Sequence, residues 1–130
     1  MSEIHISENS SSEEVYPFAR VIHELVSLPV TMRSRNRKGV RIEQGKLVDN
    51  DYTGPILEEA LEKNGVIHAI PDRGAYKGVP VVVTPLHDME GNTIAVIGVV
   101  DVVCTIDVAS VFGNYPEIVR QVEEAKKAAL

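Results

Sequence analysis

The strongest constraint on the fold is a pair of β-rich runs around a short turn, within residues 79–101. The first run, residues 79–84, is almost entirely β-branched, which suits a pleated and packed surface. The second run, residues 93–103, is apolar at odd and even positions alike, as in a strand covered on both faces. Between them, residues 87–92 (HDMEGN) supply the Asp, Gly and Asn that favour turns. The pattern predicts an antiparallel hairpin whose second strand is central in a sheet.

Two helices have recognisable starting signals. Ser10 and Ser11 stand three residues before Glu13 and Glu14, which is the capping-box spacing, and a helical stripe of apolar residues follows. Pro17 fits such a helix only within its first turn. The Gly-Pro pair at 54–55 begins a second helix, because proline is favoured at the first helical position.

The order of the remaining elements predicts the fold class. They are short strands over residues 30–33, 40–43, 46–48 and 66–70, a helical turn over 105–112 and a last helix that begins near residue 116. This order indicates an α+β fold, with a central antiparallel sheet of about five strands flanked by N-terminal, middle and C-terminal helices. We expect one domain over residues 13–130, because 130 residues is a common length for a single domain. Residues 1–12, rich in Ser and Glu, should form a flexible tail.

Composition predicts a cytoplasmic protein that does not enter a membrane. No apolar run reaches the roughly 18 residues that a spanning helix needs. The N-terminus is acidic and lacks the basic and apolar regions of a signal peptide. The single cysteine, Cys104, excludes an internal disulfide framework and fits a reducing compartment.

The charge is unevenly distributed. A net charge of −6 argues against a nucleic-acid partner, because such binding depends on neutralising phosphates. One short segment is nevertheless strongly basic, with Arg33, Arg35, Arg37, Lys38 and Arg41. One interpretation is a solvated hairpin whose long side chains protect a sheet edge from other strands. The other is a surface that binds a carboxylate, a phosphate or an acidic partner.

No catalytic or metal-binding pattern is present in the sequence. The four histidines, His5, His23, His68 and His87, lack the spacing that puts two metal ligands on one helix face. Cys104 follows an apolar strand, so a buried structural thiol is favoured over a nucleophile. No nucleophile elbow or phosphate-binding loop is found. We therefore predict no enzyme activity, no metal and no cofactor.

The loop before the hairpin is the best candidate for ligand binding. Asp72, Arg73, Tyr76 and Lys77 are crowded among glycines and prolines. A structural interpretation is an ordinary surface loop whose tyrosine covers the sheet edge. In the functional interpretation the glycines let the backbone approach a ligand, Arg73 or Lys77 contacts an anion, and Tyr76 closes the pocket.

A carboxylate at the end of the central strand completes the candidate set. Asp101 follows a run of valines, so it must be paired or reach solvent. Arg33 or Arg41 is a candidate partner, either in a structural ion pair or in a binding site. The candidate ligand-binding residues are Arg33, Arg41, Arg73, Tyr76, Lys77 and Asp101.

Two resemblances bear on the fold. The segment GVPVVVTPLHDMEGNTIAVIGVVD at residues 78–101 resembles the last two strands of PAS, GAF and Cache sensor domains. That resemblance implies a profilin-like sheet flanked by helices, with a pocket on one face bordered by the helix and loop before the central strands. More narrowly, residues 29–49, 52–65 and 74–101 are similar to an uncharacterised domain family of methanogenic archaea, which has no assigned activity.

Two functions from different classes remain open. One is a cytoplasmic sensing domain that binds a small anionic metabolite and signals through a homodimer. The other is a ligand-free interaction or dimerisation module in which the terminal helices build the interface. A ligand domain should contain a cavity of roughly a few hundred Å³ near Arg73 and Tyr76. In an interaction module, valine and isoleucine side chains should fill that volume.

Overall fold

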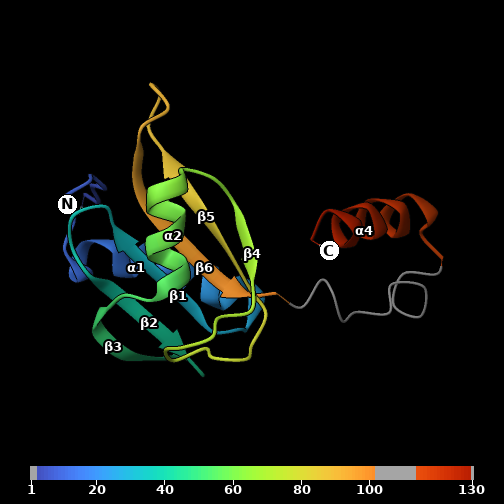
Figure 1. Cartoon of the computed structure of the whole chain (residues 1–130), viewed down its shortest axis with the longest axis horizontal. Helices are drawn as coiled ribbons and strands as arrows, with labels where there is room; N and C mark the ends of the chain where they lie inside the picture. The colour runs from blue at the N-terminus through green and yellow to red at the C-terminus, as the bar shows by residue number, and fades with distance from the viewer. Residues whose placement is uncertain (1–2, 102–113, 130) are drawn as a thin grey trace. The chain divides into compact units, whose positions relative to one another are not determined.

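The computed structural model of the chain describes residues 3–101 and 114–129 (Figure 1). These residues belong to two compact units, Met1–Val100 and Asp101–Leu130. The first unit holds one antiparallel sheet with a helix on each face, and the second holds a single described helix. The chain is therefore α+β, as predicted. That residues 13–130 form one domain stays a prediction.

The sheet has six strands in the order β3-β2-β1-β6-β5-β4, and all neighbours are antiparallel. The strands are β1 (Val30–Ser34), β2 (Gly39–Glu43), β3 (Lys46–Tyr52), β4 (Ile67–Ala69), β5 (Val81–His87) and β6 (Thr93–Val100). The predicted hairpin is confirmed as β5–β6, and β6 lies centrally between β1 and β5. The sheet exceeds the expected five strands because residues 46–48 and 66–70 both pair as separate edge strands.

Helix α1 (Ser12–Val26) packs on one face of the sheet, against β1 and β2. Its capping box is present: Ser11 Oγ accepts from the Glu14 amide, and the Glu14 carboxylate accepts from the Ser11 amide. The expectation that Pro17 lies in the first turn is wrong, because the helix begins at Ser12 and Pro17 falls in its second turn. Burial of Val15 and Ala19 on either side of the proline holds the helix in place.

Helix α2 (Pro55–Lys63) covers the opposite face, over β5 and β6. Pro55 occupies its first turn as predicted, and Asn64 ends it in the left-handed conformation. Figure 1 places α2 in front of the sheet and α1 behind it. The two helices thus divide the sheet into an α1 face and an α2 face.

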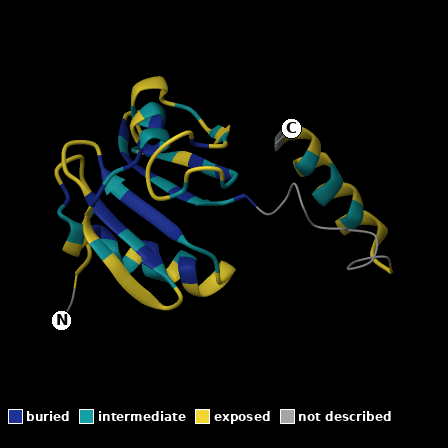
Figure 2. Cartoon of the chain, turned by 60° about the horizontal axis from the view of Figure 1, so that its bottom comes forward, coloured by how far each residue is buried: buried dark blue, intermediate teal, exposed yellow. Residues whose placement is uncertain are grey.

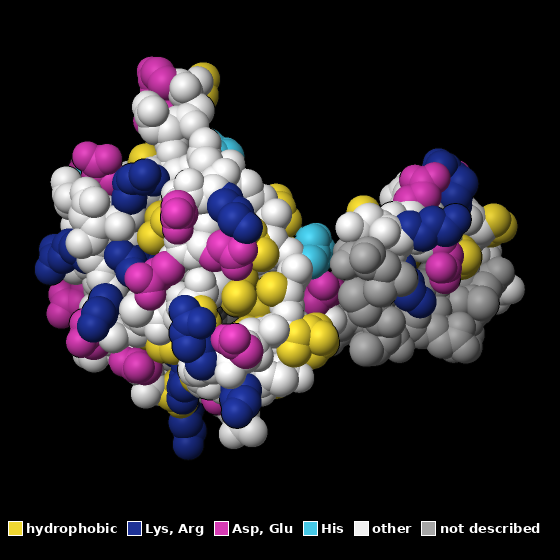
Figure 3. Space-filling model, in the orientation of Figure 1, with side chains coloured by type: hydrophobic (Ala, Val, Ile, Leu, Met, Phe, Trp, Pro, Cys, Tyr) yellow, Lys and Arg dark blue, Asp and Glu magenta, His cyan; other side chains and the backbone are white. Residues whose placement is uncertain are grey.

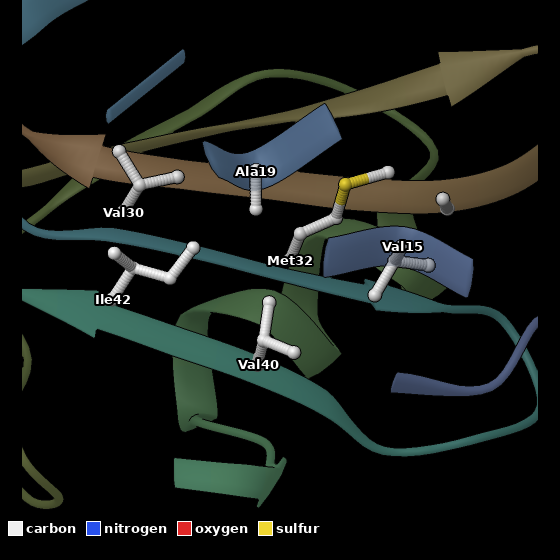
Figure 4. Packing of buried hydrophobic residues seen from close by; sticks show 7 residues of the cluster. Val15, Ala19, Val30, Met32, Val40 and Ile42 are labelled. Atoms are coloured by element: carbon white, nitrogen blue, oxygen red, sulfur yellow. The ribbon is translucent and has the colours of Figure 1, made fainter. Parts of the chain in front are cut away.

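The α1 face holds the more completely buried core. Figure 4 shows Val15 and Ala19 of α1 packed toward Val30, Met32, Val40 and Ile42 of β1 and β2. All six are fully buried. A smaller cluster on the α2 face contains Tyr52, Leu57, Ala60, Val83 and Val96. Burial is concentrated in the central strands, whereas β3 is mostly exposed (Figure 2).

The N-terminal segment lies against the turn between β1 and β2. The Asn36 amide donates to the Glu8 carbonyl at 2.9 Å, and Ser34 Oγ donates to the Ser10 carbonyl at 2.7 Å. Ile6 packs against the core of the α1 face. Residues 6–10 therefore have defined contacts with the sheet, within the stretch for which we expected a flexible tail.

The second unit is described only in part. Its helix α4 (Pro116–Ala129) confirms the predicted last helix and is held by local ion pairs such as Arg120 with Glu124, 2.7 Å apart. The predicted helical turn at 105–112, and Cys104, lie outside the described residues. Among the residues that are described, no helix has both the length and the apolar character to cross a membrane.

Candidate ligand-binding site

A small pocket lies on the α2 face of the sheet. Its cavity volume is about 30 Å³. Strands β1, β5 and β6 form the floor, the beginning of α2 forms one wall, and the loop before β5 forms the other. Its lining residues are Pro29, Thr31, Tyr52, Gly54, Pro55, Ile56, Leu57, Pro71, Arg73, Tyr76, Val81, Val83, Gly98, Val99 and Val100. The lining is mainly apolar, as expected for a small-molecule site.

The space at the floor exists because residue 98 is glycine. A Cβ on Gly98 would lie 2.8 Å from Thr31 Oγ1 and 3.1 Å from a methyl carbon of Val83. Glycine inside a strand is unfavourable unless something must approach the backbone closely. The Thr31 side chain is only 7% exposed, and its hydroxyl makes no hydrogen bond to any described residue. The Thr31 hydroxyl therefore borders the space above Gly98 and is not engaged by a described residue.

The N-terminus of α2 forms one wall of the pocket. Gly54 is its N-cap residue and offers no side chain to cap the helix, so the first-turn amides of Ile56 and Leu57 have no side-chain acceptor. The Tyr52 hydroxyl lies beside this end, because a Cβ on Gly54 would be 2.7 Å from it. Tyr52 is 8% exposed, and its hydroxyl makes no hydrogen bond within the described part of the chain.

Arg33 positions this end of α2. Its guanidinium donates to Thr53 Oγ1 at 2.9 Å and to the carbonyls of Ser34 and Arg35 at 2.9 and 3.0 Å. Burial lowers the pKa of Arg33, and the nearby Glu58 carboxylate opposes that shift. The N–H groups of Arg33 thus donate hydrogen bonds within the fold, and the bond to Thr53 connects β1 to the segment before α2.

A cluster around Arg41 borders the pocket. Its guanidinium lies 5.9 Å from the ring centre of Tyr52 and 6.0 Å from that of Tyr76, close enough for cation–π attraction. The two rings meet edge to face, with centres 6.5 Å apart. Tyr76 donates a 2.7 Å hydrogen bond to Glu43, whose carboxylate is 3.6 Å from Arg41 Nε. Arg41 Nε is buried and has no hydrogen-bond partner among the described residues.

This cluster fixes the loop before β5 to the sheet. Burial, with the hydrogen bond to Glu43 as the second cause, raises the pKa of the Tyr76 hydroxyl far above its usual value. Burial also raises the pKa of Tyr52, against the opposing effect of the Arg41 charge. Both phenols are therefore protonated donors at neutral pH.

The structure brings only some of the predicted site residues together. Arg73 and Tyr76 line the pocket, and Arg41 lies behind the two tyrosines. Lys77 is exposed and does not line it. Asp101 is buried, while the two arginines suggested as its partners contact other groups: Arg33 as described above, and Arg41 the Glu43 carboxylate.

Sequence reasoning missed Thr31, Tyr52, Gly98 and the uncapped start of α2. Two signals for them were present. Glycine within the apolar central strand marks a close approach, and a Gly-Pro helix start has no capping side chain. In the basic segment, Arg35, Arg37 and Lys38 are exposed on the turn between β1 and β2. The described residues contain no group of three His, Cys, Asp or Glu side chains that could hold a metal ion.

Comparison with known proteins places the chain in a family. A family model described as an uncharacterised protein conserved in archaea (DUF2111) matches residues 22–103. The chain belongs to the DUF2111 family. The uncharacterised protein MJ0405 of Methanocaldococcus jannaschii is 48% identical over 104 residues, which cover 79% of each chain. No solved structure matches the chain.

The predicted similarity to an archaeal family without an assigned activity is confirmed. The DUF2111 match spans the sheet, α2 and every residue that lines the pocket. Function must therefore be argued from the geometry of the site.

Proposed function

We propose that this chain is a binding domain for a small organic anion and that the ligand occupies the pocket on the α2 face. The observation that carries the proposal is a mainly apolar pocket lined by two residues, Thr31 and Tyr52, whose hydroxyls make no hydrogen bond to a described residue. Polar groups that line an apolar pocket and are not engaged by the fold are available to hydrogen-bond a ligand. Arg73 at the rim provides a positive charge.

The size of the pocket limits the ligand. A cavity of about 30 Å³ is far smaller than the few hundred Å³ that we expected for a ligand domain, and Val81, Val83, Val99 and Val100 line it, as we expected for the interaction module. Such a volume accommodates one or two water-sized groups. The ligand proposed here therefore inserts only a small group and leaves the rest of its surface at the rim.

The pocket position also supports a PAS, GAF or Cache-like domain. The pocket lies on one face of an antiparallel sheet, between a helix and the loop before the central hairpin, where that resemblance implies a ligand. We propose sensing rather than catalysis, because the polar groups at the pocket are hydrogen-bond donors and cations. A nucleophile paired with a base is not among them.

The test is a screen of small organic anions by thermal shift and by nuclear magnetic resonance of labelled protein. A ligand should raise the melting temperature and move amide signals of residues that line the pocket. Arg73→Ala should weaken binding by about fivefold, because a rim charge contributes about 1 kcal/mol at most. Lys77→Ala is the matched control, since Lys77 is an exposed cation on the same loop outside the pocket. Absence of binding by every anion would refute the proposal.

A second candidate function is an interaction or homodimerisation module. The observation that favours it is a stripe on the outer side of α1, where Phe18, Val21 and Leu25 are 40%, 57% and 78% exposed. Spacings of three and four residues put these side chains on one side of the helix. Light scattering over a range of concentrations should detect a dimer that Leu25→Glu abolishes. A monomer at all concentrations would exclude a homodimer.

A further inference from the structure

We propose that the turn between β1 and β2 docks in a groove between α2 and β4 of a second copy of this chain. The turn carries three exposed cations, Arg35, Arg37 and Lys38, and we call it the basic turn. The groove carries the carboxylates of Glu58 and Glu62. This inference goes beyond both functions proposed above, because it uses neither the ligand pocket nor the outer side of α1.

The groove follows α2 along the edge strand β4. Its cavity volume is about 550 Å³, within the range of protein sites that take up several chemical groups. Its apolar lining is formed by Pro55, Ile56, Ala69, Ile70 and Pro71. The Ile70 side chain is 65% exposed, so apolar surface remains for a partner to cover. Figure 3 shows hydrophobic side chains gathered beside α2, with acidic side chains around them.

Two carboxylates of the groove lack an ion-pair partner. The other two acids are paired within the fold: Glu59 lies 2.7 Å from Lys63 Nζ, and Asp72 lies 3.4 Å from Arg73 Nη1. Glu58 and Glu62 form no ion pair with a described residue. The charge of Arg33 reaches Glu58, but the N–H groups of Arg33 donate to other oxygens. Since like charges four residues apart repel on one side of a helix, a cation from outside would stabilise both carboxylates.

The basic turn offers cations that the fold does not pair. Arg35 and Arg37 each donate to a backbone carbonyl at 3.4 Å, and neither they nor Lys38 form an ion pair with a described residue. The turn is held in place, because Asn36 is hydrogen-bonded to residues 8–9. A preformed loop loses little conformational freedom on binding. The aliphatic stems of its long side chains can cover the apolar lining of the groove while their charged ends meet the carboxylates.

The basic turn and the groove of one copy lie on different faces of the sheet. The turn is bonded to the segment before α1, whereas the groove lies beside α2 on the other face. In the sheet, β6 and β5 separate β1 from β4. The groove is therefore filled by the turn of another copy, in a head-to-tail contact that leaves one turn and one groove free for further copies. With a net charge of −6 the copies repel at long range, so the association is weak.

The test is sedimentation velocity of the full chain over a range of concentrations. The association constant should fall at least tenfold between about 0.05 and 0.5 M NaCl, because salt screens exposed charges. Arg37→Glu and Glu58→Lys should each weaken association at least tenfold at low salt. An equal mixture of the two variants should associate again, because each reversed turn then meets a groove of opposite charge.

Two further charge reversals are the matched controls. Lys77→Glu changes an exposed cation outside the groove, and Glu90→Lys changes an exposed acid at the tip of the β5–β6 hairpin. Both should associate as the unmodified chain does. Circular dichroism melting of all four variants checks that they fold, and association of the mixture reports on the contact even if one variant is less stable.

The remaining outcomes overturn the inference. A chain that is monomeric at every concentration at low salt has no such contact. If copies associate but neither reversal weakens them, or only Leu25→Glu does, they meet through another surface. If both reversals weaken association and their mixture does not restore it, the turn and the groove are not partners. Anion binding is measured separately by thermal shift, so each of these results leaves the proposed function standing.

Discussion

The two faces of the sheet differ in how many of their polar side chains have hydrogen-bond partners within the fold. On the α1 face, Ser34 donates to the Ser10 carbonyl, and both ring nitrogens of His23 are engaged, by the Leu28 carbonyl and the Gly45 amide. On the α2 face, the hydroxyls of Thr31 and Tyr52 have no partner among the described residues. The α1 face thus uses more of its polar side chains within the fold, although Thr93 Oγ1, on the same side of β6 as Ala95, is buried without a hydrogen-bond partner among the described residues.

Both faces are built from the same strand. Thr31 and Met32 are neighbours in β1, and successive side chains of a strand point to opposite faces. The α1 face receives Val30 and Met32, while the α2 face receives Thr31 and Arg33. The surface around α2 carries charged side chains of both signs beside a small group of hydrophobic ones (Figure 3). Stability and binding should therefore respond separately to substitutions one residue apart.

The largest expected loss of stability comes from a cavity in the core of the α1 face. Met32 is fully buried beneath α1, so Met32→Ala should lower the free energy of unfolding by about 2–5 kcal/mol through lost burial and a new cavity. Urea denaturation measures the change. Met89→Ala, at the exposed tip of the β5–β6 hairpin, is the control and should have almost no effect. A loss below about 1 kcal/mol in Met32→Ala would mean that the α1 face is not the main core.

The division into faces could be predicted from the sequence only in part. The hairpin was predictable, because a strand that is apolar at every position must be covered on both faces. The extent of β3 was not, since Asp49, Asn50 and Asp51 have low strand propensity, and β3 extends through them because Asp49 and Tyr52 pair with β2 on either side. Strand propensity depends on the local sequence, so it cannot predict a strand that forms only by pairing with another strand.

The candidate site was harder to predict than the fold. Arg73 and Tyr76 were found because a loop with glycines and a cation is typical of binding segments. The partners of Tyr76 could not be found, because Glu43 lies 33 residues away in the chain and meets it only through the sheet register. The basic charge of Arg33 indicated a ligand, but neighbouring carbonyls satisfy its donors.

A loss of stability of intermediate size should appear at high pH, through Tyr76 on the α2 face. The folded state raises the pKa of Tyr76, so the unfolded chain loses this proton first. The associated stability is complete below the ordinary tyrosine pKa and is lost as the pH rises above it, by about 1 kcal/mol per unit beyond roughly pH 10. Tyr76→Phe should unfold more easily at pH 7 but lose less stability between pH 10 and 11.

The measurement is urea denaturation of both proteins at pH 7, 10 and 11. Tyr115→Phe serves as control, because it removes the hydroxyl of an exposed tyrosine from the second unit. If Tyr76→Phe and the unmodified protein lose the same free energy of unfolding between pH 10 and 11, the Tyr76–Glu43 contact does not hold the loop on the sheet.

The smallest expected effects on stability compare the hydroxyls of two β1 residues, Ser34 and Thr31. Ser34→Ala removes a hydrogen bond on the α1 face and should cost about 1 kcal/mol, since the Ser10 carbonyl loses its donor. Thr31→Val removes a hydroxyl on the α2 face that makes no hydrogen bond to a described residue, and its free energy of unfolding should stay within about 0.5 kcal/mol of the unmodified chain. Anion binding should show the opposite order, with Ser34→Ala unchanged and Thr31→Val weakened.

This opposite order decides whether the unpartnered hydroxyls matter for function. A structural hydroxyl contributes to stability whether or not a ligand is present, whereas one reserved for a ligand contributes only in the complex. If Thr31→Val destabilises the free protein as much as Ser34→Ala does, the Thr31 hydroxyl has a partner within the fold. The α2 face would then be a second core with an accidental gap above Gly98.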